Sequence, residues 1–134
     1  MGGRLLRRWL ALPLKNVKQI EERHHVVEYF FRNPQEKEFF TQQFSMVGDM
    51  ERLLSKVAVG RISPREVWQL RTAMKAIEPI KQLCLSSTDE VIRSFGERLY
   101  DCISIREKIE KLLNENPPIM LNKGNIICSG VDEE

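Results

Sequence analysis

Apolar residues recur along most of the chain at the three- and four-residue spacing of one helix face, with charged residues on the opposite face. The first such segment covers residues 2–12 and ends at Pro13, which cannot continue a helix. Its apolar side and its basic side are formed by Leu5, Leu6, Trp9 and Leu10, and by Arg4, Arg7 and Arg8. No capping residue precedes Arg4, so we expect this helix to be longer in the parent protein.

Two further helices are predicted between residues 16 and 47. Asn16 is placed to cap the first, with Gln19 at its third position. Asn33 is expected to cap the second, with Pro34 at its first position and Glu36 at its third. The apolar positions of the two helices are Ile20, His24, Val27 and Phe31, and Phe39, Phe40 and Phe44.

The next two helices are marked by local start and stop signals. A short helix opens after Asp49 and closes at Gly60. Ser63 and Glu66 then form a capping-box pattern, and we expect Pro79 to kink or restart the helix that follows. The apolar positions are Met50, Leu53, Leu54 and Val57, and then Val67, Leu70, Met74 and Ile77.

The last third of the chain predicts one more helical region and a short strand. Ser87 and Glu90 form another capping-box pattern. Apolar residues then recur at helical spacing from Val91 to about Asn114, and the prolines at 117 and 118 forbid continuation. Residues 123–130 form a short β-branched run between turns, which is typical of a strand. We therefore predict an all-α fold, a multihelical orthogonal or bundle-like array of about six helices with a short C-terminal β segment.

Composition agrees with a single soluble domain. The 134 residues are 42% hydrophobic and 30% charged. No apolar run approaches the roughly 18 residues that a spanning helix needs. The basic N-terminus lacks the apolar region of a signal peptide, and the odd count of three cysteines favours a reducing compartment. We expect a cytoplasmic protein without contact to a membrane, with its cysteines (Cys84, Cys102 and Cys128) buried as small apolar side chains.

No residue pattern indicates catalysis, a cofactor or a metal. Phosphate-loop, nucleophile-elbow and HExxH motifs are missing from the sequence. His24 and His25 diverge on a helix and cannot share a metal, so we expect His24 near the core and His25 in solvent. The carboxylate pairs at residues 21–22 and 132–134 are interpreted as solvated, and Trp9 and Trp68 as core anchors. We predict no catalytic, cofactor-binding or metal-binding residue, and no enzymatic activity in this segment.

The net charge of +2 is unevenly distributed. Residues 1–34 hold seven Lys and Arg against three Asp and Glu, and residues 52–81 hold seven against two. Such excesses can favour nucleic acid, although a solvated helix face is the commoner explanation.

Five stretches in sequence order resemble MutS-type DNA mismatch-repair ATPases. Residues 2–14 are similar to the start of that family's core domain, and residues 20–31 to its next helix. Residues 48–56 (GDMERLLSK) and 60–66 (GRISPRE) resemble its GDLERLLSR-like stretch and its GRxSPRD-like turn, with Glu66 in place of the commoner Asp. Residues 124–134 resemble the segment that leads into ELDELR. Together the matches cover nearly the whole chain.

The resemblance implies a core or lever domain (domain III) over residues 1–134. Residues 1–12 would be a truncated lever helix, residues 89–114 a helical region leading toward the DNA clamp, and residues 120–134 a short strand at the start of the clamp boundary. In this family an N-terminal domain reads the mismatch and a C-terminal domain binds ATP and magnesium. None of those residues maps onto this sequence.

The function that the resemblance implies is mechanical. The segment would link the ATPase and clamp regions and relay ATP-driven motion to DNA binding. Its partners would be other domains of the parent chain and, through the parent protein, which we expect to be a homodimer, duplex DNA. One alternative is direct binding of the DNA backbone through Arg4, Arg7 and Arg8 or the basic segment 52–81. Another is a paralogue of the family that does not act on mismatches.

Overall fold

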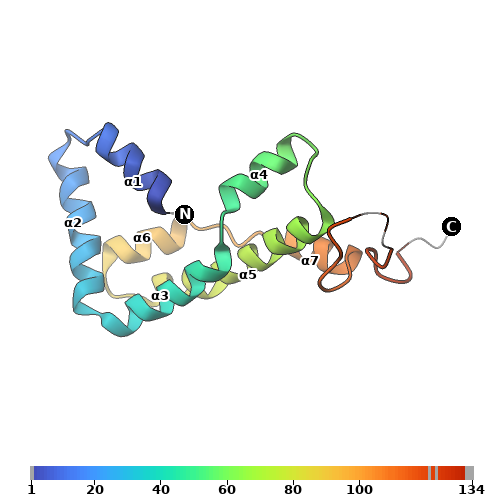
Figure 1. Ribbon diagram of the computed structural model, residues 1–134. Coiled ribbons are helices and arrows are strands. Elements are labelled where there is room, and N and C mark those ends of the chain that lie inside the picture. Colours follow the sequence, from blue (N-terminus) through green and yellow to red (C-terminus); the bar gives the residue numbers. More distant parts are fainter. Residues whose placement is uncertain (1, 121, 123, 132–134) are drawn as a thin grey trace.

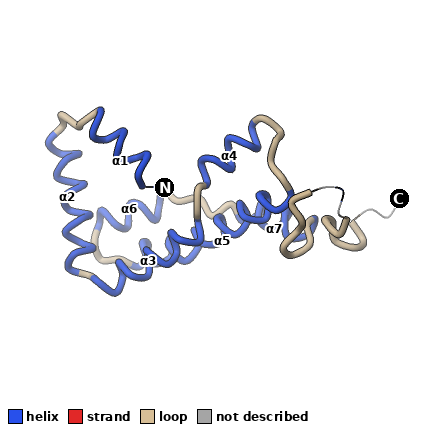
Figure 2. The backbone as a smooth tube through the Cα atoms, viewed as in Figure 1, coloured by secondary structure: helices blue, strands red, loops and turns tan. Residues whose placement is uncertain are grey.

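The protein is described here by a computed structural model that covers residues 2–120, 122 and 124–131. Helices account for its regular structure, and Figure 2 shows no strand among the described residues. The all-α prediction is therefore confirmed. The helices are α1 (Gly2–Ala11), α2 (Val17–Arg32), α3 (Pro34–Val47), α4 (Met50–Ala58), α5 (Pro64–Ser86), α6 (Glu90–Arg98) and α7 (Ile103–Leu112).

Helix α5 is the central element, and α3, α4, α6 and α7 all pack against it (Figure 1). Its start is the predicted capping box. The Ser63 hydroxyl accepts a hydrogen bond from the Glu66 N–H, and the Glu66 carboxylate accepts one from the Ser63 N–H. Of the two outcomes predicted at Pro79, a kink or a restart, the restart is wrong, because α5 continues through Pro79 as one helix. Ala76 and Ile80, on either side of Pro79, are both buried. Their packing offsets the loss of the helical hydrogen bond that Pro79 cannot donate.

Two apolar clusters lie along α5. We call the first the α2–α6 cluster, because α2 and α6 supply most of the side chains that meet α5 and α3 there, and the second the α4–α7 cluster. The buried members of the α2–α6 cluster are Phe40, Ile80, Cys84 and Ile92. Those of the α4–α7 cluster are Leu53, Leu70 and Met74, with Cys102 and Ile109 packed against them. One helix thus contributes to the core at both of its ends.

The apolar run after residue 90 forms two helices instead of one. Helix α6 ends at Arg98, and α7 begins only at Ile103. Cys102 between them has a φ of 51°, in the left-handed region. The spacing of apolar residues runs unbroken across this junction, so periodicity alone did not reveal the break.

Three local predictions in the first two-thirds need correction. Asn33 does not cap α3 with its side chain; its amide donates to the Tyr29 carbonyl oxygen instead. Asp89, not Ser87, caps α6, because its carboxylate accepts hydrogen bonds from the Val91 and Ile92 N–H groups. His24 is exposed instead of lying near the core, while His25 is exposed, as predicted, and contacts Asp89.

The predicted C-terminal β segment is wrong for the described residues. The segment forms only an isolated antiparallel bridge between Leu113 and Ile127. Its hydrogen bonds run from the Asn114 N–H to the Ile126 carbonyl oxygen and from the Cys128 N–H to the Leu112 carbonyl oxygen. Positive φ angles at Gly124 and Gly130 leave too short an extended run for a ladder. The remainder of that prediction, at residues 121, 123 and 132–134, lies outside the described residues, as does the acidic run 132–134.

Helix α1 is the least buried helix. None of its residues is buried, and Trp9 is 39% exposed instead of anchoring the core. The Arg23 guanidinium of α2 lies 3.6 Å above the centre of the Trp9 ring and covers it. Trp68 is half-buried on α5 beneath Arg71. Within the described residues, no helix combines the length and apolar character needed to cross a bilayer.

Candidate functional site

The most distinctive feature of the molecule is a row of ion pairs between α5 and the 101–110 segment. We call this row the α5–α7 seam. It consists of Arg71 with Glu110, Glu78 with Arg106, and Lys81 with Asp101. The Arg71 Nε–Glu110 Oε1, Arg106 Nη1–Glu78 Oε2 and Lys81 Nζ–Asp101 Oδ2 distances are 2.6, 2.8 and 3.3 Å.

The seam is partly shielded from solvent. The side chains of Arg71 and Arg106 are only 17% and 14% exposed, so their charges are screened less than those of ordinary surface pairs. The hydrogen bond to Glu78 raises the pKa of the Arg106 guanidinium. Arg106 therefore stays charged and needs its carboxylate partner.

A second polar junction joins α4 to the start of α5. The Glu66 carboxylate accepts hydrogen bonds from Lys56 Nζ at 2.5 Å and from Arg52 Nη1 at 3.3 Å, besides its capping bond to Ser63. The Lys56 ammonium, followed by the Ser63 N–H, lowers the pKa of Glu66 to about 2. One carboxylate thus caps α5 and also fixes α4 against it.

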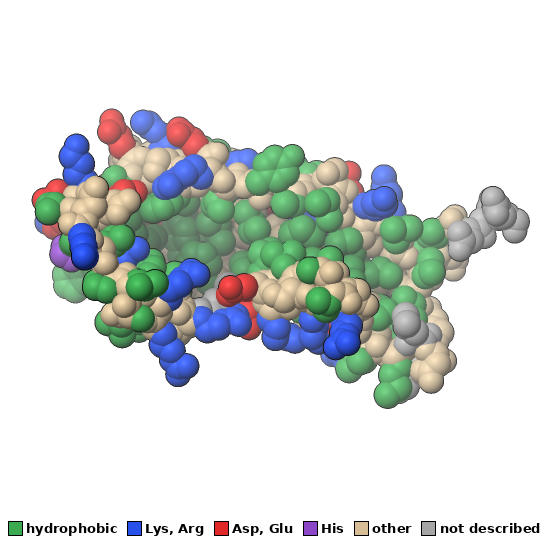
Figure 3. All heavy atoms as spheres, turned by 90° about the horizontal axis from the view of Figure 1, so that it is seen from above, with side chains coloured by type: hydrophobic (Ala, Val, Ile, Leu, Met, Phe, Trp, Pro, Cys, Tyr) green, Lys and Arg blue, Asp and Glu red, His purple; other side chains and the backbone are tan. Residues whose placement is uncertain are grey.

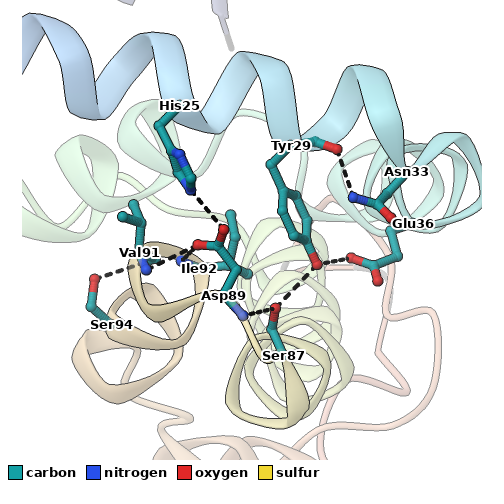
Figure 4. Close-up of polar contacts among 9 residues, drawn as sticks. All are labelled: His25, Tyr29, Asn33, Glu36, Ser87, Asp89, Val91, Ile92 and Ser94. Atoms are coloured by element: carbon teal, nitrogen blue, oxygen red, sulfur yellow. Dashed lines mark hydrogen bonds and ion pairs between the residues drawn. The ribbon is translucent and has the colours of Figure 1, made fainter.

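A third junction links α2 and α3 to the α5–α6 turn (Figure 4). The Tyr29 hydroxyl donates to Glu36 Oε2 at 2.5 Å and lies 3.1 Å from the Ser87 Oγ. Burial, followed by the hydrogen bond to Glu36, raises the pKa of Tyr29. Close by, His25 Nε2 lies 2.6 Å from Asp89 Oδ2.

Asp89 combines this contact with its role as the cap of α6. Partial burial on its own raises the pKa of Asp89, but hydrogen bonds from the Ile92 N–H and from His25 outweigh it and lower the pKa. The junction is a set of mutually hydrogen-bonded polar groups that hold α2 and α3 against the α5–α6 turn.

Five of the ten basic residues considered for DNA binding form ion pairs within the molecule; those without one among the described residues are Arg7, Arg8, Arg61, Arg65 and Lys75. Arg4 of α1 pairs with Asp49, the N-cap of α4, and the N–H of Arg52, followed by Arg4, lowers the pKa of Asp49. In the 52–81 segment, Arg52 and Lys56 pair with Glu66, and Arg71 and Lys81 belong to the α5–α7 seam. These charges tie helices together, which reduces their availability for phosphate.

The space-filling view shows hydrophobic side chains gathered in a hollow at the middle of one face (Figure 3). An apolar groove of 750 Å³ lies over the α2–α6 cluster and is lined from α2, α3, α5 and α6. Phe44, which lines it, is 53% exposed. This groove offers apolar contact and almost no polar group that could orient a small substrate.

Gly96 is a packing position that the sequence analysis did not identify. A Cβ at this position of α6 would lie 2.8 Å from the Cys84 Cβ and 2.9 Å from the Leu85 backbone nitrogen. The missing side chain therefore permits the close approach of α6 to α5. A glycine inside an apolar helical pattern was the available signal.

The cysteines differ in their surroundings. Cys84 is buried in the α2–α6 cluster, as predicted, and burial raises the pKa of its thiol. Cys102 and Cys128 are only partly buried, so the prediction was wrong for those two.

Comparison with known proteins identifies the family of this chain. The family described as MutS domain III matches residues 1–129. The chain belongs to the MutS domain III family. The resemblance of its five sequence stretches is therefore confirmed.

Whole proteins of similar sequence carry the same assignment. The chain is 54% identical to the DNA mismatch repair protein MutS of Parabacteroides distasonis and to that of Bacteroides thetaiotaomicron, and 47% identical to that of Flavobacterium johnsoniae. Each comparison covers all of this chain but only 15% or 16% of the relative. The chain thus spans about a sixth of the length of the curated relatives that it matches.

Proposed function

We propose that this domain III segment is a mechanical connector in a DNA mismatch repair protein. It links the ATPase region to the DNA clamp and relays ATP-driven motion to DNA binding. A relay needs a stiff element that distant parts of the molecule both contact. Helix α5 has that property, since one continuous helix enters both apolar clusters and four other helices pack on it.

The polar junctions support the same proposal. Three separate sets of charged or hydrogen-bonded groups fix neighbouring helices to α5 or to the turn that follows it: the Glu66 junction, the Tyr29–Ser87 junction and the α5–α7 seam. Each set holds one helix against its neighbour, so a displacement of one helix moves the next.

The chemistry in this proposal lies outside the segment. ATP and magnesium bind elsewhere in the parent protein, mismatch recognition belongs to another domain, and this segment is not itself an enzyme. The parent protein is a cytoplasmic homodimer in this proposal, and its substrate is duplex DNA. A paralogue with another DNA substrate would use the same connector.

The test exploits an exposed position between the two clusters. Lys75 lies in the middle of α5, is exposed, and is four residues before Pro79, which already lacks an N–H for the Lys75 carbonyl oxygen. In the full chain, Lys75→Gly softens α5 by about 1 kcal/mol without removing a core side chain, and Lys75→Ala is the matched control. We expect Lys75→Gly alone to slow ATP-induced release of DNA, with both ligands still bound normally. Normal coupling in Lys75→Gly would contradict the proposal.

Direct DNA binding is the competing outcome. It predicts that this segment binds duplex DNA with a steep dependence on salt concentration, because phosphate contacts release counterions. A titration with duplex DNA at low salt measures this. Binding that is lost in an Arg7→Gln/Arg8→Gln variant would favour the DNA-binding alternative over the connector.

A further inference from the structure

We propose that α7 is a charge-held latch on α5, which opens as a unit from its Cys102 end while the remaining helices stay folded. In the relay described above, α7 would be the part that moves. Only this use of the latch rests on the proposed function. Whether α7 opens is a property of the chain that can be measured without ATP or DNA.

The attachment of α7 is mainly electrostatic. None of its residues is buried, and α5 is the helix that it packs against. Among the described residues of α7, Ile109 is the one that packs against a buried apolar cluster, where it joins Cys102 at the edge of the α4–α7 cluster. The three ion pairs of the α5–α7 seam therefore carry an unusually large part of the attachment.

The order of the charges prevents α7 from sliding along α5. Along α5 the seam reads positive, negative, positive at Arg71, Glu78 and Lys81, and the facing groups alternate in the opposite sense. In this antiparallel arrangement, a slide of one turn toward the C-terminal end of α5 brings Arg106 opposite Lys81, and a slide of two turns the other way brings it opposite Arg71. Like charges would then face each other in a partly shielded seam. Movement of α7 must therefore be detachment, which gives two discrete arrangements.

The backbone at the start of α7 is the weak point. Leu99 is extended and Cys102 is left-handed, with φ 51° and ψ 34°. A non-glycine residue in this region costs about 1 kcal/mol or more, and α7 begins without a side-chain cap. The longest ion pair of the seam, Lys81 with Asp101, lies at this same end. Opening from the Cys102 end relieves the strain and breaks the weakest contact first.

The far end of α7 is held more firmly. The bridge between Leu113 and Ile127 follows the helix directly, and Pro117 is fully buried. These contacts keep the segment attached while its Cys102 end opens. Opening then uncovers the edge of the α4–α7 cluster at Ile109.

Hydrogen exchange read by mass spectrometry on the full chain tests the latch. Exchange is compared at about 0.05 M and about 1 M NaCl, where the screening length falls from more than 10 Å to about 3 Å. We expect the hydrogen-bonded amides of residues 103–109, which begin at Arg106, to exchange about 5–10-fold faster at high salt, because the seam weakens. The segment of α5 that holds the buried residues Ala73, Met74 and Ala76 should not accelerate. Equal protection of both segments at both salt concentrations would overturn the proposal.

Charge variants identify the seam as the cause. Arg106→Gln should accelerate exchange in residues 103–109 about 5-fold at low salt and reduce its salt dependence. Arg93→Gln is the control, since Arg93 is exposed on α6 and has no ion pair among the described residues. The exchanged pair Glu78→Arg with Arg106→Glu should restore most of the protection. An equal effect of Arg93→Gln, or no recovery in the exchanged pair, would overturn the latch.

The latch and the relay can fail separately. If residues 103–109 open as expected but Arg106→Gln leaves ATP-induced DNA release unchanged, the latch stands and its use in the relay is wrong. If residues 103–109 do not open locally while Lys75→Gly uncouples ATP from DNA, the relay stands and its moving element lies elsewhere.

Discussion

At the residue scale, single side chains serve two neighbours at once. Glu66 closes the first turn of α5 and pairs with Lys56 of α4. Tyr29 bonds both Glu36 and the Ser87 side chain. Asp89 caps α6 and meets His25 of α2. Local helix capping and long-range packing therefore depend on the same few polar atoms.

Glu66 makes this dependence measurable by pH. Its pKa falls from 4.5 to about 2 on folding, so its stabilising contribution is complete above pH 4.5 and is lost as the pH falls toward 2. We expect Glu66→Gln to be less stable than the parent chain at pH 7, with a shallower loss of stability between pH 4.5 and 2. Urea unfolding midpoints across that range give the measurement.

The matched control is Glu97→Gln, because Glu97 is exposed on α6 and has no ion pair among the described residues. A Glu66→Gln chain with the same pH dependence as the parent would show that the junction contributes nothing to acid sensitivity.

At the scale of elements, the closeness of α6 to α5 depends on a missing side chain. Gly96 faces Cys84 and Leu85, and both α6 and α5 bury residues at this contact. The constraint is steric, because the nearest atoms include a backbone nitrogen that cannot rotate away.

A methyl group at Gly96 should therefore destabilise the chain. Overpacking costs about 1–3 kcal/mol, whereas alanine in place of glycine gains about 1 kcal/mol of helix propensity. We expect a net loss of up to about 2 kcal/mol for Gly96→Ala, measured by urea unfolding. Gly3→Ala on α1 is the control, since a Cβ there meets nothing within 4 Å. A Gly96→Ala chain as stable as Gly3→Ala would mean that α6 accommodates the methyl freely.

The helices also show where sequence patterns suffice. The starts of α2, α4 and α5 agree with the capping residues Asn16, Asp49 and Ser63, since capping is a contact within one turn. The continuity of α5 at Pro79 and the break after Arg98 did not follow from pattern. Both features depend on the contacts that other helices make with α5 and α6, and a local pattern does not contain these contacts.

At the scale of the whole molecule, the two apolar clusters share α5 but no buried residue. Ile92 and Leu53 are buried members of different clusters. A helix common to both should make their unfolding cooperative.

This arrangement predicts additive losses within one transition. We expect Ile92→Ala and Leu53→Ala each to cost about 2–5 kcal/mol, and the double variant to cost their sum within about 0.5 kcal/mol. Ile105→Ala is the control, because Ile105 is exposed on α7. Thermal unfolding followed by circular dichroism should show one transition; two separate transitions would mean that α5 does not join the clusters into one unit.

The sequence by itself determined the helical class, most helix starts and the family, because periodicity, caps and short motifs are local properties of the chain. It also indicated correctly that Cys84 is buried. Only the tertiary structure decided which charges meet in the α5–α7 seam, how near Gly96 brings α6 to α5, and that Arg4 pairs with Asp49. These contacts join residues up to 45 positions apart, and their formation depends on the packing of whole helices, which no local pattern encodes.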